Sequence, residues 1–190
     1  SAASDVYKRQ IFYWGHSDAT LRAWSLVGLI GSILLLLGCS NALLVLLLWA
    51  IYFSFVSVGQ LFYSYGWESQ ILETSFLAMF LCPIRGWRLS RAKHSPSLII
   101  IWLHRWLAFR IMLGAGLIKI RGDECWRDLT ALDYHFETQP IPNPLSWYLH
   151  HMPDWALRGG TFWNHVIELA VPILIFWPRR ARLVAGVLLI

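Results

Sequence analysis

Residues 23–67 read AWSLVGLIGSILLLLGCSNALLVLLLWAIYFSFVSVGQLFYSYGW, and this stretch holds no Asp, Glu, Lys, Arg or His. One helix needs about 20 apolar residues to cross a bilayer, so the stretch is too long for a single crossing. Its one polar, turn-prone break is Gly38-Cys39-Ser40-Asn41. The pattern therefore predicts two membrane-spanning helices, over residues 21–38 and 41–63.

The composition of the whole chain points to the same environment. Of its 190 residues, 57% are hydrophobic and 14% are charged, whereas a soluble domain has roughly 25% charged residues. So few charges cannot cover a water-facing surface, which excludes a soluble enzyme and a disordered tail. The net charge of +5 does not indicate nucleic-acid binding, because the basic residues lie at the ends of apolar segments. The chain is expected to be an integral membrane protein.

Apolar segments continue along the rest of the chain. The fold class expected is all-α, a polytopic transmembrane helical bundle of about five spans plus a truncated sixth. Residues 1–10 carry no membrane or core pattern and are set aside as a non-native or unstructured leader, so residues 11–190 form the predicted transmembrane domain. The remaining spans are predicted over residues 69–84 (ending at Pro83), 97–119 and 162–177 (closed by Pro178), with the sixth starting after Arg182.

The basic residues predict which side of the membrane each connection occupies, because cytoplasmic loops are enriched in Lys and Arg. Two short connections carry such clusters, namely Arg85, Arg88, Arg91 and Lys93, and Arg179, Arg180 and Arg182. Both are placed in the cytoplasm. Threading the chain from there puts residues 64–68 and 120–161 on the opposite side and returns residues 39–41 to the cytoplasm.

Residues 120–161 are predicted to form one long non-cytoplasmic loop. The segment holds six of the eleven acidic residues and many aromatic ones, and three alternate prolines from Pro140 favour an extended path. Two interpretations stay open: a cap whose aromatic rings lie at headgroup level, or a lid or docking surface for a client. The residues proposed for the lid or client surface are Trp126, Asp128, Asp133, Tyr134, His135 and Glu137.

Ionisable residues within predicted spans each need a partner, because inserting one costs roughly 2.5–3.5 kcal/mol. His104 and Arg105 lie close enough to the cytoplasmic end to reach water, whereas Arg110 is deeper. Glu73 in the preceding span is the nearest candidate partner by type. A Glu73–Arg110 pair is therefore predicted.

His165 and Glu168 are three residues apart and share one helix face, with Asn164 beside them. Pro172 cannot donate to the carbonyl of Glu168, so a kink is expected there. A His-x-x-Glu pair holds a metal only when a second pair faces it, and none is visible. The pair is expected to fix helix packing through a hydrogen bond, with no metal bound.

Lys119 follows the small residues Gly114-Ala115-Gly116, which let another helix approach closely. A lysine in such a dry site can act as a base. Arg121 lies at the same boundary, and the residues alone favour an interfacial anchor for Lys119. The three cysteines, Cys39, Cys82 and Cys125, are far apart and predict neither a disulfide framework nor a metal site.

Several long motifs resemble the lipase maturation factor family, over nearly all of the chain from about residue 12. They are Gly66-Trp67-Glu68 with Leu72-Glu73-Thr74, FRIMLGAGLIK at residues 109–119, RGDECWRDLT at residues 121–130, DYHFETQPIPNP at residues 133–144 and NHVIE at residues 164–168. The resemblance implies a membrane-embedded maturation factor that assists secreted homodimeric lipases to fold or assemble. It further implies an endoplasmic-reticulum membrane if the source is eukaryotic and an inner membrane if it is bacterial.

A weaker similarity links the stretch before Lys119 to the vitamin K-dependent gamma-carboxylases, in which a lysine at the matching place is the catalytic base. The chain departs from that family at Trp67-Glu68-Ser69-Gln70. This similarity implies the alternative function, a membrane enzyme with Lys119 as base on a lipid or quinone and with Glu73, His165 and Glu168 in its pocket. The leading hypothesis is a non-catalytic factor without a cofactor, whose partners are secreted lipases and membrane lipid.

Overall fold

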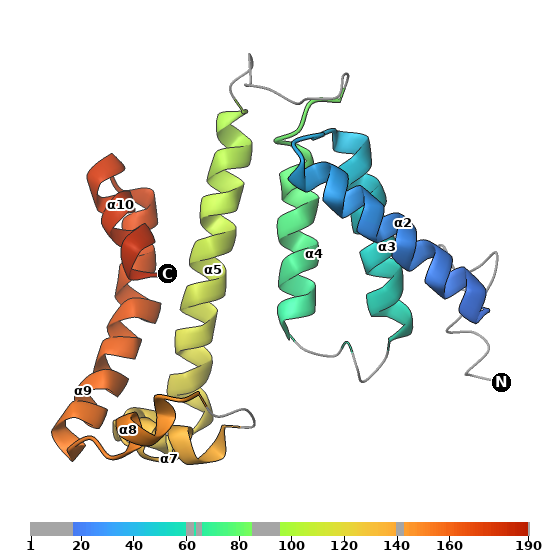
Figure 1. Ribbon diagram of the computed structural model, residues 1–190. Helices are drawn as coiled ribbons and strands as arrows, with labels where there is room; N and C mark the ends of the chain where they lie inside the picture. Colours follow the sequence, from blue (N-terminus) through green and yellow to red (C-terminus); the bar gives the residue numbers. More distant parts are fainter. Residues whose placement is uncertain (1–16, 60–62, 64–65, 85–95, 140–142, 190) are drawn as a thin grey trace. The chain divides into compact units, whose positions relative to one another are not determined.

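The computed structural model describes residues 17–59, 63, 66–84, 96–139 and 143–189, and the elements of this part of the chain are helices joined by turns (Figure 1). The all-α prediction is confirmed. Residues 1–104 and 105–190 form two compact units, called unit 1 and unit 2 below. The proposed leader, residues 1–10, lies outside the described residues.

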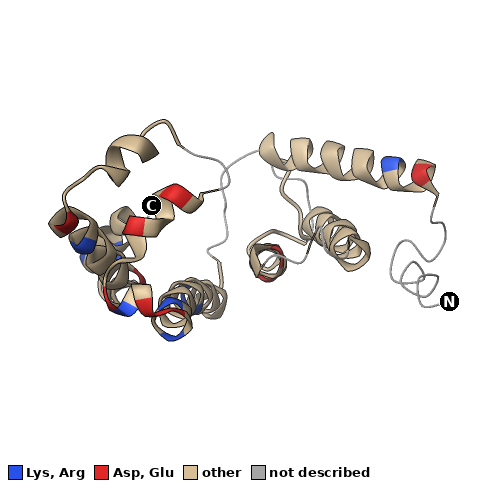
Figure 2. Ribbon diagram, turned by 90° about the horizontal axis from the view of Figure 1, so that it is seen from below, with Lys and Arg blue, Asp and Glu red and all other residues tan. Residues whose placement is uncertain are grey.

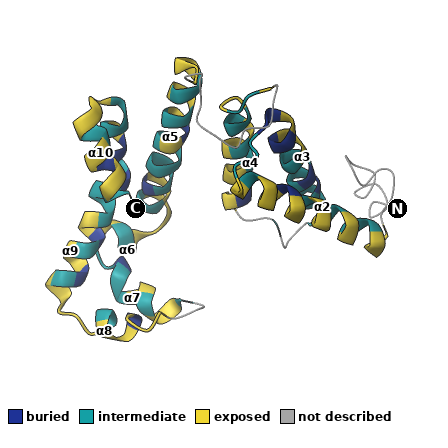
Figure 3. Cartoon of the chain, turned by 45° about the horizontal axis from the view of Figure 1, so that its top comes forward, coloured by how far each residue is buried: buried dark blue, intermediate teal, exposed yellow. Residues whose placement is uncertain are grey.

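The described part of unit 1 contains α2 (Asp18–Leu36), α3 (Ala42–Val58), α4 (Gly66–Met79) and the start of the next helix. Both α2 and α4 pack against α3. The first two helices begin at side-chain caps, because Ser17 accepts a hydrogen bond from the Thr20 N–H at 3.2 Å and Asn41 accepts one from the Leu43 N–H at 2.7 Å. Much of the outer surface of α2 is exposed and apolar (Figure 3).

The turn between α2 and α3 confirms the predicted break at residues 38–41. Gly38 has a φ of 91°, in the left-handed region that favours glycine, and it ends α2. Asn41 then reaches past its own helix, since its Nδ2 donates to the Ile84 carbonyl at 3.3 Å. The Ala42 N–H donates to the Pro83 carbonyl at 3.0 Å. The turn is thus joined to the segment that follows α4.

The third predicted span differs from α4 in both position and length. Residues 66–68, expected in a turn, form the first turn of α4, and Glu68 there is buried at 5% exposure. The helix ends at Met79 instead of continuing toward Pro83. Its 14 residues extend about 21 Å, short of the roughly 30 Å hydrocarbon core.

Unit 2 contains most of α5 (Leu98–Gly122) and a second long helical run, formed by α9 (Asp154–His165), η3 (Val166–Ala170) and η4 (Val171–Phe176). α10 (Arg179–Leu188) turns back against η4. The expected disturbance at Pro172 takes the form of a change in helix type, from α through one π turn in η3 to the tighter 3₁₀ turns of η4. The Phe109 and Phe176 rings, 5.2 Å apart, pack α5 on η4.

The segment predicted as one long loop is largely helical, so that prediction is wrong in its local structure. It forms α6 (Glu124–Arg127), α7 (Ala131–Thr138) and α8 (Ser146–His150), and α9 begins at Asp154. We call α6, α7 and α8 the cap. They gather at one end of unit 2, and the connection from η4 to α10 lies at the other end (Figure 1). Seen from below, acidic and basic residues are spread over several helices of unit 2 (Figure 2).

Short capping interactions explain why helices form within the cap. The Cys125 N–H donates to the Asp123 carboxylate, with N and Oδ1 3.1 Å apart, and this hydrogen bond holds the pKa of Asp123 below its usual range. Leu129, with a φ of 60°, ends α6 in the left-handed conformation. The Thr130 N–H then bonds to the Cys125 carbonyl at 2.9 Å, which closes the helix end. The predicted extended path is not tested, since residues 140–142 are not described.

Three described helical runs are long and apolar enough to cross a membrane: Asp18–Leu36, Leu98–Gly122 and Asp154–Phe176. α3 is a shorter apolar helix of 17 residues. The chain is thus an integral membrane protein, while the count of five spans plus a sixth stays a prediction. The first basic cluster, at residues 85–93, lies outside the described residues, and the second begins α10. The sidedness therefore stays a prediction too.

Candidate functional site

A part-buried ion pair joins the two long helical runs of unit 2. Lys119, in the last turn of α5, donates from Nζ to the Oε1 atom of Glu168 in η3. The side chains are 27% and 11% exposed, respectively. Asn164 adds its Oδ1 atom 3.5 Å from the same nitrogen. Burying two charges is favourable only when they are paired closely, and this pairing meets that condition.

Two features of the backbone bring the ion pair together. The π turn of η3, in which the Val171 N–H bonds to the Val166 carbonyl, contains Glu168. Gly116, one turn before Lys119, lets η3 approach α5, because a Cβ atom there would lie 2.7 Å from Leu169 Cδ2 and 3.1 Å from Glu168 Cβ. The predicted close helix approach is confirmed at Gly116, whereas Gly114 has no neighbour within 4 Å of such an atom.

Trp126 of α6 connects the cap to this pair. Its ring centroid lies 4.7 Å from Lys119 Nζ, within the range of a cation–π interaction. Its backbone carbonyl lies 2.9 Å from Nε2 of His165, and the two rings meet edge to face at 5.8 Å. We call Lys119, Trp126, Asn164, His165 and Glu168 the Lys119 cluster. It ties the first helix of the cap to both α5 and the α9–η3 junction.

The polar groups of the Lys119 cluster contact one another and are partly enclosed by protein. Three of its polar atoms, Asn164 Nδ2, His165 Nδ1 and Glu168 Oε2, are enclosed by protein and make no hydrogen bond in the described structure. A reacting group could not reach these enclosed atoms without a rearrangement. The Lys119 amino group contacts the Glu168 carboxylate and the Asn164 side chain. Among the described residues, no group of three His, Cys, Asp or Glu side chains could hold a metal ion.

The remainder of the cap is held by polar contacts and by one close approach to α9. The Ser146 hydroxyl donates to Gln139 Oε1 at 3.1 Å, which links α8 to the end of α7. Glu137 and His150 also connect these helices, with Oε1 and Nε2 3.2 Å apart. At Gly160 a Cβ atom would lie 2.7 Å from Leu132 Cδ1, so α7 and α9 pack closely at this point.

The residues predicted for the lid or client surface separate into two groups. Trp126 is half-buried inside the Lys119 cluster, and Asp133 is half-buried with its Oδ1 atom enclosed. The other four are exposed, namely Asp128, Tyr134, His135 and Glu137. Further exposed aromatic residues, which the prediction did not single out, lie on α8 and α9: Trp147 at 64%, Tyr148 at 66% and Trp155 at 78% exposure.

The structure describes the predicted intramembrane residues one group at a time. Glu73 belongs to unit 1 and Arg110 to unit 2, so their pairing stays a prediction. His165 and Glu168 lie side by side as expected, but they bond to different elements, α6 and α5. Lys119 is paired within the protein, which neither the anchor nor the base interpretation anticipated. The three cysteines are free thiols in the described structure.

A second buried glutamate, which the sequence reasoning did not treat as a site, lies in unit 1. Tyr52 on α3 donates its hydroxyl to Oε2 of Glu68 on α4. The nearby Trp49 donates from its indole nitrogen to the Leu72 carbonyl at 3.0 Å. The available signal was the position of Glu68 directly after the long charge-free run.

Comparisons with known proteins cover almost the whole chain. Residues 3–190 match the family model described as the lipase maturation factor transmembrane domain. The chain is 56% identical to human lipase maturation factor 1 over 92% of its own length and 31% of the relative's, and 54% identical to the cattle protein over the same shares. Against human lipase maturation factor 2 the identity is 39%, over 87% of this chain and 26% of the relative.

The chain thus spans about a third of the length of the lipase maturation factor 1 relatives that it matches. No solved structure matches it.

Proposed function

The chain belongs to the lipase maturation factor family, and from this premise we propose that it is the membrane-embedded part of a factor that helps secreted homodimeric lipases to fold and assemble. The observation that carries the proposal is the match to lipase maturation factor 1 over 92% of the chain. The alternative of a membrane enzyme with Lys119 as base lacks support, because the reported relatives are all lipase maturation factors and the Lys119 amine is engaged by Glu168.

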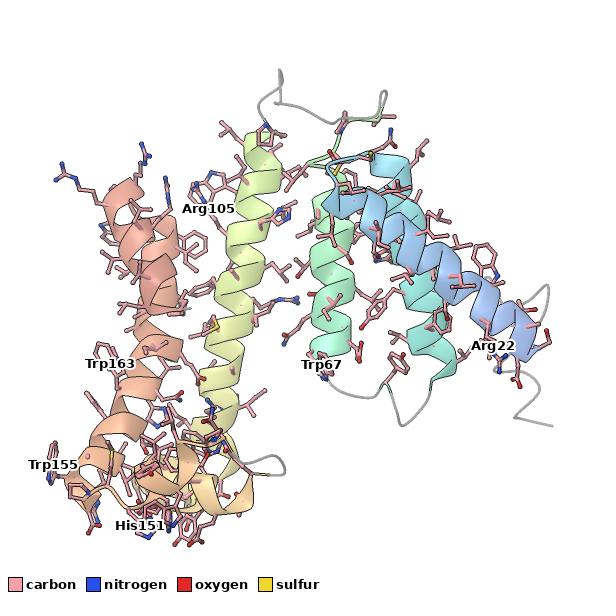
Figure 4. The ribbon with its side chains drawn as sticks, viewed as in Figure 1. Arg22, Trp67, Arg105, His151, Trp155 and Trp163 are labelled. Carbon is pink, nitrogen blue, oxygen red and sulfur yellow. The ribbon has the colours of Figure 1, made fainter. Side chains whose placement is uncertain are left out.

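The client surface in this proposal is the exposed aromatic part of the cap and of the start of α9. Trp147, Tyr148 and Trp155 offer large apolar area together with polar atoms, a combination suited to partly folded proteins. Figure 4 shows His151 and Trp155 projecting outward from this end of unit 2. The Lys119 cluster would keep this surface in place while a client binds.

The proposed location is the endoplasmic-reticulum membrane, with the cap facing the lumen. The relatives from human and cattle support a eukaryotic setting. Secreted lipases fold on the luminal side, so a client surface there would meet them. The acidic cap and the arginine-rich start of α10 lie at opposite ends of unit 2, as this orientation requires.

Co-expression tests the proposal. The full-length protein that contains this chain would be expressed with a homodimeric secreted lipase in cells that lack their own maturation factor. We expect it to raise the secreted specific activity and the dimer fraction of the lipase. Trp155→Ala should lower the yield of active dimer by about fivefold, the effect of losing about 1 kcal/mol of contact energy.

Trp177→Ala is the matched control, because Trp177 is a 58% exposed tryptophan near the opposite end of the same unit. Equal lipase activity with and without the protein would contradict the proposed function. Equal losses from the two tryptophan variants would contradict the assignment of the client surface to the cap.

A further inference from the structure

Unit 1 contains a partly open pocket of about 400 Å³ between α2, α3 and α4. This volume lies within the roughly 300–1,000 Å³ range of small-molecule sites. The walls are mainly apolar, with Leu48, Ile51 and Phe55 from α3 and Leu35 from α2. The pocket lies in unit 1 and shares no residue with the Lys119 cluster or the cap.

The polar side chains that line the pocket have no donor left for a ligand. Each already donates a hydrogen bond within the protein, and the hydroxyls of three serines bond to carbonyls of their own helices. The donations are Ser25 to Leu21 at 2.9 Å, Ser32 to Gly28 at 2.8 Å, Ser75 to Ile71 at 2.6 Å, Trp49 to Leu72 at 3.0 Å and Tyr52 to Glu68. An occupant therefore gains burial but no new hydrogen bond from these donors.

We infer that this pocket holds one acyl chain of a bilayer lipid. The wall formed by α2 belongs to a candidate membrane span of 19 residues with a mean hydropathy of 1.7. Apolar residues of that helix, such as Leu29 at 57% and Ile33 at 47% exposure, face the surroundings. The molecules that surround such a helix are lipid chains, and a pocket in its side is filled from them.

A ligand or peptide with polar groups fits this pocket less well than a hydrocarbon chain. Carbonyl groups or other acceptors of such a ligand would lose their water and find no unused donor among the lining side chains. A hydrocarbon chain brings no group that needs a partner. The bound lipid would brace α2 against α3, and this role does not depend on the proposed client function.

Photolabelling in bilayers tests the inference. The full chain would be reconstituted with a phosphatidylcholine that carries a diazirine at the middle of one acyl chain, and labelled peptides would be mapped by mass spectrometry. We expect labels concentrated on pocket residues of α2 and α3. Gly28→Leu should reduce them about tenfold by filling the pocket. A Cβ atom at position 28 lies 3.6 Å from Ile51, an ordinary contact, so the backbone accepts the change.

Two further variants keep the test decisive. Ser32→Leu fills the pocket from another position on α2 and should reduce the labels in the same way if Gly28→Leu fails to fold. Gly114→Leu is the matched control, because a Cβ atom there has no neighbour within 4 Å and position 114 lies outside the pocket. Labels spread evenly over exposed apolar helix surfaces, or pocket labels unchanged in both filling variants, would overturn the inference.

Discussion

Each of the two units buries a glutamate, and the two glutamates have different kinds of hydrogen-bond partner. In unit 1, Glu68 is 5% exposed and accepts from the neutral hydroxyl of Tyr52. In unit 2, Glu168 is 8% exposed and pairs with the ammonium group of Lys119. The partner of Glu68 comes from the charge-free run, which offers no cation, whereas the partner of Glu168 lies in the last turn of α5, which carries basic residues.

The difference separates two ways of holding membrane helices together. The described contacts of unit 1 include apolar packing and hydrogen bonds from uncharged donors, Trp49 and Tyr52. Hydrogen bonds between membrane helices average about 0.6 kcal/mol. Unit 2 places a charged cluster where its helices meet the cap, and the position of the cap then depends on that cluster. The units should therefore respond differently when the partner of each glutamate is removed.

The largest effect is expected from Lys119→Met, which leaves Glu168 buried and without its cation. Removing one member of a buried pair typically costs about 3–5 kcal/mol, and the lower end applies because the Lys119 side chain is 27% exposed. We expect about 3 kcal/mol less stability in thermal unfolding in detergent micelles.

Arg127→Met is the control for this prediction. Arg127 also pairs with a glutamate, Glu124, at 3.4 Å, but the two side chains are 54% and 84% exposed. Such a surface pair contributes little. If the two variants unfolded at the same temperature, the Lys119–Glu168 pair would not have the structural role assigned to it.

Tyr52→Phe is expected to have a smaller effect, because it removes one hydrogen bond from an uncharged hydroxyl and does not remove a cation. The expected loss is about 1 kcal/mol, measured in the same unfolding experiment. A loss as large as that of Lys119→Met would show that the two glutamates are held alike, and the comparison between the units would fail.

The long-range features of the sequence predicted the all-helical class and several of the helix boundaries. A charge-free run interrupted only at residues 38–41 predicted two helices, because a turn needs polar residues and a glycine where the backbone adopts a positive φ. The small side chain of Gly116 predicted a close helix contact for a steric reason that does not depend on the rest of the fold. Prolines indicated where helical geometry changes, and Pro172 follows the π turn directly.

The cap and the ion pair could not be predicted in the same way. Helices as short as α6 and α8 cannot show the hydrophobic periodicity that identifies longer helices. Only local signals, such as Asp123 before Glu124, indicate them. The pairing of Lys119 with Glu168 joins residues 49 positions apart. Charge type alone does not select between such distant partners. The sequence therefore predicts only an interfacial anchor or a catalytic base for Lys119.

Hydrogen exchange of backbone amides in the wild type and in Glu168→Gln tests most directly whether the Lys119 cluster holds the cap. The substitution keeps the shape of the side chain and removes its charge. We predict that amides of α6 and α7 exchange about tenfold faster, while those of α2 and α3 are unchanged. Unchanged exchange in α6 and α7, or equal acceleration in both units, would contradict the account.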